Sequence, residues 1–361
     1  MGHSELTGEL IPRHLNVRVI AKDNLETFLG GLREFGEVFG PVEKERGAYI
    51  YAQLTDVKNV VQDAQRTVLP PKKYLYPQKE ELFRFSTQEG YRKPESVDKG
   101  RKILFGVHPC DIHGLSILDK VFAGRYHEPR YFDRRDNLII IGMNCLPDER
   151  CFCYSMGTDW VEKGFDLFLT ELEDSYFVKI GTSCGEDLVH AQAELFRPVT
   201  DEDIQLYKER VNERNKMFVN RVELANLPQI LELEYESEVW EELGRKCLSC
   251  GACSAVCPTC YCYEVYDVLD LNVETGSRIR RWDACLFKDF AKVAGGHNFR
   301  EERSTRVKHR FYHKQVTFVE EFGRPSCVGC GRCVTQCPAG INLIDVFKEI
   351  RGEKVVHKSA R

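Results

Sequence analysis

Two cysteine-rich stretches decide how this chain is organised: KCLSCGACSAVCPTCYC at residues 246–262 and CVGCGRCVTQCPAGI at residues 327–341. Both repeat the spacing Cys-x2-Cys-x2-Cys-x3-Cys-Pro. Small residues such as Gly251 and Gly331 stand between the cysteines, where backbone N–H groups can come close to whatever the thiolates hold. The motif cysteines are Cys247, Cys250, Cys253 and Cys257 in the first stretch, and Cys327, Cys330, Cys333 and Cys337 in the second.

This spacing is that of bacterial proteins with two iron–sulfur clusters. Three closely spaced thiolates surround one [4Fe–4S] cube, and the fourth cysteine, followed by proline, ligates the other cube. The spacing therefore predicts two [4Fe–4S] clusters with crossed ligation. Cluster one takes Cys247, Cys250, Cys253 and Cys337, and cluster two takes Cys327, Cys330, Cys333 and Cys257. A pair of structural zinc sites is the alternative, but zinc needs only four ligands in two pairs per site.

The interval between the motifs, from Cys257 to Cys327, spans 70 positions and is too long for a compact β-hairpin ferredoxin. Helix-like segments at 263–271 and 283–293 predict an α-helical ferredoxin-like dicluster domain, which we place at residues 236–361. The interval holds three more cysteines without a fourth partner. They are either free buried thiols or part of a further site completed from elsewhere: Cys260, Cys262 and Cys285.

A basic stretch from Arg278 to Lys314 holds eleven Lys or Arg residues against four Asp or Glu. Cations near a cluster held by four thiolates offset its negative charge and raise its potential. The same stretch also suits a docking face for a partner, or a solvated basic helix. Sequence leaves these three interpretations open.

Residues 1–235 have the pattern of a mixed α/β domain. Apolar runs at 101–107 and 137–142, bounded by polar or turn residues, predict buried strands. The other expected elements are a strand at 16–21, a helix at 24–35, a hairpin from 165–172 and 175–180, and a helix capped by Thr200 and Asp203 that runs to about Phe218. A glutamate-rich segment at 222–244, with no Lys or Arg, marks the domain boundary.

Four cysteines of this first domain form a further candidate site. Cys110 and Cys145 each follow a strand-like run, where ligands of α/β sheets commonly gather. Cys151 and Cys153 are too close together for a disulfide. We therefore predict a third [4Fe–4S] cluster on these four thiolates, with a redox thiol pair or buried structural cysteines as the alternatives. Cys184 stands alone and receives no role.

Composition excludes several classes of function. The chain has 361 residues, sixteen cysteines and a net charge of −5, which argues against a general nucleic-acid binder. Its longest apolar stretch, LIIIGM at 138–143, is far short of the roughly 20 residues that cross a membrane. The first ten residues show no secretory signal. Neither a P-loop nor a G-x-G-x-x-G dinucleotide fingerprint is present, and no set of residues stands out as able to transform an organic substrate.

Several segments resemble a known family. They are FGVHPCDIHGL (105–115), CLPDERCFC (145–153), RRWDACLF (280–287), VAGGHNFR (293–300) and the two cysteine motifs. Across roughly residues 100–345 the chain is similar to the iron–sulfur β subunit of cytosolic, NAD(P)-linked [NiFe] hydrogenases of the sulfhydrogenase type. Related to it are the A subunit of anaerobic sulfite reductase and the dicluster subunit of flavin oxidoreductases coupled to heterodisulfide reductase.

The resemblance implies a cytoplasmic electron-transfer subunit of an oxidoreductase that carries out no bond chemistry itself. Its expected partners are a flavin subunit that binds NAD(P) and the small and large subunits of a hydrogenase, with no nucleic acid and no membrane. Single electrons would pass through its [4Fe–4S] clusters between these partners. The sulfite reductase and heterodisulfide-linked versions are the alternatives. A zinc-stabilised adaptor that only binds other proteins is an alternative of a different class.

Overall fold

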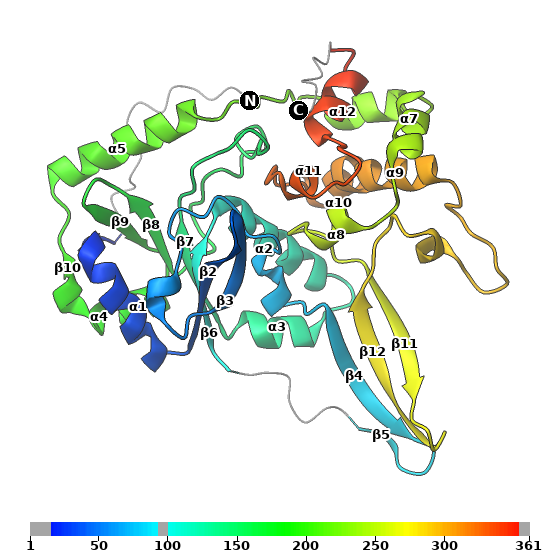
Figure 1. The fold of residues 1–361 in the computed structure, drawn as a ribbon, viewed down its shortest axis with the longest axis horizontal. Helices are drawn as coiled ribbons and strands as arrows, with labels where there is room; N and C mark the ends of the chain where they lie inside the picture. The colour runs from blue at the N-terminus through cyan, green and yellow to red at the C-terminus, as the bar shows by residue number, and fades with distance from the viewer. Residues whose placement is uncertain (1–15, 93–99, 354–361) are drawn as a thin grey trace.

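The computed structural model of the protein describes residues 16–92 and 100–353, so the first ten residues discussed above lie outside it (Figure 1). The larger of its two sheets has eight strands in the order β10-β1-β9-β8-β7-β6-β2-β3. These strands are β1 (Val17–Ala21), β2 (Glu37–Glu45), β3 (Ala48–Gln53), β6 (Lys102–Val107), β7 (Leu138–Met143), β8 (Leu167–Glu171), β9 (Ser175–Ile180) and β10 (Phe196–Arg197).

The centre of this sheet is parallel and its outer strands are antiparallel. Strands β2, β6, β7 and β8 run in parallel, with Ile103 opposite Ile139, as expected for apolar runs buried on both faces. Strands β8 and β9 form the antiparallel hairpin that the sequence predicts. The helices of this region are α1 (Leu25–Gly31), α2 (Pro109–Phe122), α3 (Pro129–Arg135), α4 (Ser183–His190) and α5 (Asp201–Lys216), with 3-10 turns at Lys22–Asn24, Leu32–Glu34, Val57–Asn59, Pro71–Tyr74 and Ala193–Leu195.

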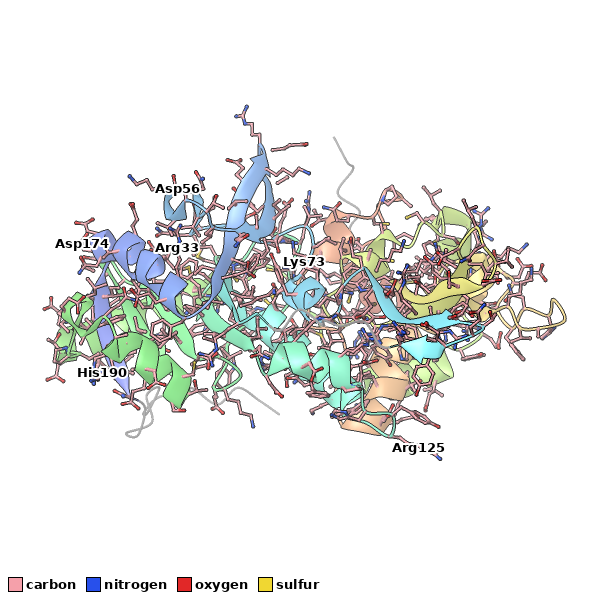
Figure 2. The ribbon with its side chains drawn as sticks, turned by 90° about the horizontal axis from the view of Figure 1, so that it is seen from below. Arg33, Asp56, Lys73, Arg125, Asp174 and His190 are labelled. Atoms are coloured by element: carbon pink, nitrogen blue, oxygen red, sulfur yellow. The ribbon has the colours of Figure 1, made fainter. Side chains whose placement is uncertain are left out.

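Two apolar cores hold the large sheet in place. One contains Phe28 of α1 and Leu188 of α4 on one side of the sheet, and the other contains Leu115 and Leu118 of α2. Helix α5 begins with the predicted capping box, in which Thr200 and Asp203 each accept a hydrogen bond from the other's backbone N–H. Seen from below (Figure 2), Asp174 and His190 lie at the opposite end of the molecule from the hairpin of β11 (Tyr263–Leu269) and β12 (Thr275–Trp282).

The second sheet projects as an arm at the lower right of Figure 1. Its order is β11-β12-β4-β5, where β4 spans Lys79–Ser86 and β5 spans Gly90–Arg92. The helix expected at 263–271 is therefore wrong. The segment YEVYDVL is rich in aromatic and β-branched residues, which favour strands, and β12 pairs with it along its whole length. The helix expected at 283–293 is also wrong, because only a 3-10 turn at Lys288–Ala291 forms there.

Short helices surround the cysteine motifs in the remaining part of the chain (Figure 1, upper right). They are α6 (Leu227–Leu233), α7 (Val239–Lys246), α8 (Ala252–Ala255), α9 (Arg303–Tyr312), a π-helical turn at His313–Thr317, α10 (Phe318–Phe322), α11 (Arg332–Thr335) and α12 (Leu343–Ile350). The mixed α/β class is confirmed, whereas an α-helical description of the dicluster part is not, because the β11–β12 hairpin lies between its two motifs.

Contacts cross the predicted boundary between residues 235 and 236, and the division at that point stays a prediction. Leu227 and Leu231 of α6 pack in the same apolar core as Trp240 of α7 and Phe347 of α12. Strand β4, from the first half of the chain, pairs with β12 from the second half. In the part of the chain that the structure describes, no helix is long and apolar enough to cross a membrane.

Candidate iron–sulfur sites

The first group of cysteines lines one cavity. Cys247 directly follows α7 and Cys253 lies within α8, whereas Cys337 follows α11 of the other motif. The remaining wall is mostly apolar, with Phe311 among its residues, and also includes Arg310. The structure thus brings together the set that the crossed scheme assigns to cluster one, which consists of Cys247, Cys250, Cys253 and Cys337.

The local backbone of this group suits an iron–sulfur cube. The N–H of Ser249 donates to Sγ of Cys247 at 3.3 Å, and the N–H of Ile341 donates to Sγ of Cys337 at 3.3 Å. Such bonds stabilise a cluster's negative charge and raise its potential. Gly251 has a φ of 73° at the start of α8, and a Cβ there would lie 2.6 Å from the ring of Phe287. The turn between Cys250 and Cys253 therefore requires glycine.

The second group consists of Cys257, Cys327, Cys330 and Cys333, and it lies around α11. Burial raises the pKa of Cys330 to about 11, and the nearby thiols of Cys257 and Cys333 add to that rise. Burial together with Cys333 raises the pKa of Cys327 to about 12. Nζ of Lys314 donates both to Thr259, whose Oγ1 is 3.3 Å from Sγ of Cys257, and to Ser326, which precedes Cys327, and α8 of the first motif contacts α11 of the second. The set assigned to cluster two is therefore also brought together, although ligation itself stays a prediction.

The four cysteines of the first domain also line one cavity. Cys110 is the second residue of α2 after β6, and Cys145 follows the neighbouring strand β7. Parallel strands that end side by side bring their following loops to one edge of the sheet, as predicted. Cys151 and Cys153 reach the same cavity from farther along the loop that carries Cys145, and a hydrogen bond between their thiols lowers the pKa of Cys151.

This third site rests directly on the second motif. Backbone N–H of Phe152 donates to the carbonyl of Gly329 at 2.8 Å, and Oγ1 of Thr158 donates to the carbonyl of Val328 at 2.7 Å. Gly329 has a φ of 62°, and a Cβ there would lie 2.6 Å from the backbone nitrogen of Cys153. The close approach of the two loops therefore requires glycine at position 329.

Two cysteines of the second group connect the three sites in a series. Cys330 lines the cavity of the first-domain cysteines, and Cys333 lines the cavity of the first group. The second group therefore lies between the other two. This serial arrangement was not visible in the sequence, because it depends on how α11 packs between two distant loops.

Buried ion pairs fix this arrangement and were missed by sequence reasoning. Arg332 of the second motif donates to both carboxylate oxygens of Asp111 on α2, at 2.6 and 2.7 Å. The two residues are only 2% and 1% exposed. Arg66 pairs with Asp148 beside Cys151, and Arg214 donates to the carbonyl of Cys145 at 2.8 Å. The one available sequence signal was the position of Arg332 inside the motif and of Asp111 beside Cys110.

The three cysteines that the sequence left open lie near the two C-terminal groups. Cys260 contacts Cys257, and its thiol hydrogen bond lowers the pKa of Cys257 well below its usual value. Cys262 and Cys285 also share a thiol hydrogen bond. Nζ of the buried Lys72 donates to the carbonyl of Cys260 at 2.8 Å. Within residues 16–92 and 100–353, no three His, Cys, Asp or Glu side chains are arranged around a single metal ion.

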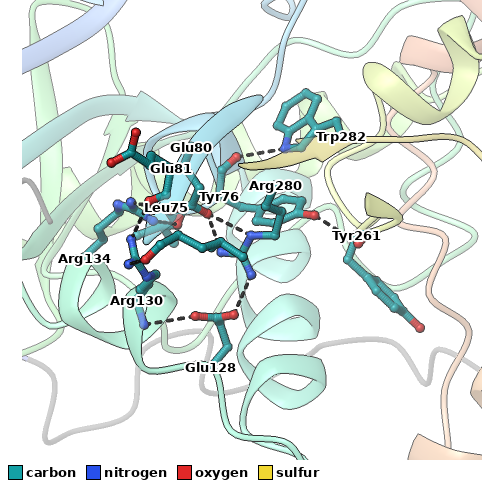
Figure 3. Close-up of polar contacts among 11 residues, drawn as sticks. Leu75, Tyr76, Glu80, Glu81, Glu128, Arg130, Arg134, Tyr261, Arg280 and Trp282 are labelled. Atoms are coloured by element: carbon teal, nitrogen blue, oxygen red, sulfur yellow. Dashed lines mark hydrogen bonds and ion pairs between the residues drawn. The ribbon is translucent and has the colours of Figure 1, made fainter. Parts of the chain in front are cut away.

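The RRWDACLF segment anchors the arm to the large sheet (Figure 3). Arg280 of β12 is 4% exposed and forms ion pairs with Glu80 of β4 and with Glu128, next to α3. Arg134 of α3 donates to the same Glu80 at 2.8 Å. Nε1 of Trp282 donates to the carbonyl of Tyr76 at 3.1 Å. Arg280 and Trp282 therefore join β12 to the first half of the chain beside the insertion cysteines.

Substituting Arg280 with methionine is expected to cost about 3 to 5 kcal/mol of unfolding free energy, because it removes one of the two cations that pair with buried Glu80 and leaves the partly buried Glu128 without its cation. Arg281 is the matched control, since its partner Glu264 is exposed and Arg281→Met should cost less than about 1 kcal/mol. Anaerobic urea denaturation followed by circular dichroism measures both. Equal effects of the two substitutions would contradict the anchoring role of Arg280.

Comparisons with known proteins bear on the two C-terminal cysteine motifs and on the family of the chain. A family model described as "4Fe-4S dicluster domain" matches residues 246–341, which contain both C-terminal cysteine motifs. The chain is 42% identical to the protein named "Sulfhydrogenase 2 subunit beta" from Pyrococcus furiosus, over 90% of this chain and 95% of that protein. No solved structure matches the chain. The chain therefore belongs to the iron–sulfur family of the sulfhydrogenase β subunit.

Proposed function

We propose that this chain is the electron-transfer subunit of a cytoplasmic oxidoreductase complex and that it relays single electrons through three [4Fe–4S] clusters. The partners would be a flavin subunit that binds NAD(P)H and the small and large subunits of a [NiFe] hydrogenase. The observation that carries this proposal is the serial arrangement of the three cysteine groups, in which Cys330 and Cys333 each border a neighbouring site.

The residues at all three sites suit the proposed clusters. When bound, a [4Fe–4S] cluster accepts and donates single electrons at a potential that its surroundings set. Eight thiolates of the C-terminal motifs hold two of these clusters in the crossed scheme, and Cys110, Cys145, Cys151 and Cys153 hold the third. All sixteen cysteines of the chain are free of disulfides, which suits the reducing cytoplasm.

The protein's own residues limit access to the sites. Leu286, Val307, Phe311 and Leu343 line the first cavity and keep water from its inner wall. Cys250 is exposed, as is Leu248 beside it, so this site reaches the surface where a partner can bind. The third site lies at the other end of the series, with Arg66 and Asp148 at its wall. Electrons would therefore enter at one end of the series and leave at the other.

Omission of this chain from a reconstituted complex tests the proposed function. Without it, NAD(P)H-dependent hydrogen production should fall to background, because the flavin and hydrogenase subunits lose their connection. Hydrogen production from a reduced viologen dye should stay unchanged, because the dye delivers electrons to the hydrogenase subunits directly. Retention of NAD(P)H-dependent activity without the chain would contradict the relay and favour an adaptor role.

A further inference from the structure

Helix α9 and the π-helical turn that follows it carry two buried cations, Arg310 and Lys314. Both are 5% exposed, and they lie one turn apart on the same side. Like charges at this spacing destabilise a helix, and burial without a counter-charge adds to the cost. A π-helical turn is rare and often marks a functional position. The two cations therefore require a nearby negative charge.

Carboxylates do not supply that charge. Neither cation takes part in any of the ion pairs found among residues 16–92 and 100–353. Nζ of Lys314 donates to two neutral hydroxyls, Oγ1 of Thr259 at 2.9 Å and Oγ of Ser326 at 3.5 Å. Nε of Arg310 is buried without a hydrogen-bond partner.

Arg310 and Lys314 both lie close to cysteines. Oγ1 of Thr259, which accepts from Nζ of Lys314, lies 3.3 Å from Sγ of Cys257, and Ser326, the other acceptor, directly precedes Cys327. Arg310 lines the first cavity together with Cys253 and Cys333. Its guanidinium also forms a hydrogen bond with Cys333. Arg310 therefore lies between the first and second groups, whereas Lys314 faces the second group.

The other two sites differ in their surroundings. At the third site Arg332, Arg66 and Arg214 each have a buried or half-buried carboxylate partner, so those pairs are close to neutral. The first site shares Arg310 and lies near Arg306, whose guanidinium donates to the carbonyl of Leu286 at 2.9 Å and to Oγ of Ser249 at 3.2 Å. The second group alone faces both Arg310 and Lys314.

We infer that Arg310 and Lys314 set the potential of the central cluster, which is the one proposed at the second group, and make this potential the highest of the three. This inference rests on the proposed function. A [4Fe–4S] cluster gains negative charge when it is reduced, so an unpaired cation nearby stabilises the reduced form. The central cluster then takes the first electron that enters the chain. It holds that electron between the two outer clusters until a partner accepts it.

Redox titration of the full chain, followed by electron paramagnetic resonance, tests the inference. Lys314→Met should lower the potential of the highest-potential centre by at least about 59 mV. For a one-electron reduction this corresponds to a tenfold change in the equilibrium constant. The potentials of the other two centres should not change. Lys314→Arg should restore the wild-type value. Lys308→Met is the matched control, because Lys308 lies on the same helix and its Nζ donates to the carbonyl of exposed Tyr235.

The Cys330→Ser variant provides a second test if the Lys314→Met chain does not assemble its clusters. Cys330→Ser, which removes a proposed ligand of the central cluster, should abolish the signal with the highest potential. Loss of a lower-potential signal instead would overturn the inference, as would an unchanged potential in an iron-replete Lys314→Met chain. A wild-type chain without iron–sulfur signals would instead contradict the proposed function, so the two failures are distinguishable.

Discussion

Replacing Cys337 with serine is expected to remove the iron–sulfur centre whose other ligands are Cys247, Cys250 and Cys253, although Cys337 belongs to the other motif. The structure places Cys337 on the wall of the cavity formed by those three cysteines. The variant should therefore keep about eight of about twelve iron atoms per chain. Iron analysis of anaerobically purified protein measures this loss.

Double substitutions show which cysteines share a centre without assigning any spectrum. Cys337→Ser combined with Cys250→Ser should lose no more iron than Cys337→Ser alone, because both residues serve one centre. Cys337→Ser combined with Cys330→Ser should lose a second centre. The reverse pattern would mean that each motif holds its own cluster. Cys184→Ser is the control, since Cys184 packs against the core of the large sheet, away from the three sites.

Crossed ligation also means that the clusters contribute to the stability of the fold. The two motifs lie 80 positions apart in the sequence, from Cys247 to Cys327, and each centre would join them. Binding of a metal centre by residues that are distant in the chain contributes directly to folding free energy. Loss of either centre should therefore also loosen the packing of α7 and α9 around the shared apolar core.

The sequence predicted those features that depend on local pattern. The apolar runs of β6 and β7 were recognisable, and with them the positions of Cys110 and Cys145 at neighbouring strand ends. The cap of α5 was also recognisable, because Thr200 and Asp203 are only three positions apart. Each of these signals is complete within a few residues, so no knowledge of tertiary packing was needed.

Features that depend on distant partners were not predictable. Strand β11 has apolar spacing compatible with a helix, and its strand form depends on β12 and on β4, which lies nearly two hundred positions earlier. Arg332 and Asp111 are 221 positions apart, so their ion pair appears only once α11 rests on α2. The order of the three cysteine groups follows from that same packing and was therefore invisible in the sequence.

Cys151→Ser is expected to remove a third centre and leave the two C-terminal centres in place. Cys151 lines the cavity of the first-domain cysteines and does not line the cavity of the first group. Iron content should fall from about twelve to about eight atoms per chain, while the double-substitution pattern of the C-terminal cysteines persists. The full chain is needed, because Gly329 and Cys330 form part of the site.

Arg332→Met offers an independent test of the same site. Asp111 would lose its buried partner beside Cys110, and the carbonyl of Thr67 would lose its donor, at a cost of about 3 to 5 kcal/mol. The N-terminal centre should then be the first to be lost on mild warming under anaerobic conditions. A wild-type chain that holds only the two C-terminal centres would make the four first-domain cysteines structural.

The iron, acid-labile sulfide and zinc content of the anaerobically purified full chain tests the central claim most directly. A relay of three [4Fe–4S] centres predicts about twelve iron and about twelve sulfide per chain, with a broad visible absorption that disappears on reduction. About eight iron would shorten the relay to its C-terminal pair. Stoichiometric zinc with little iron and no visible absorption would contradict the relay and leave a zinc-stabilised adaptor in its place.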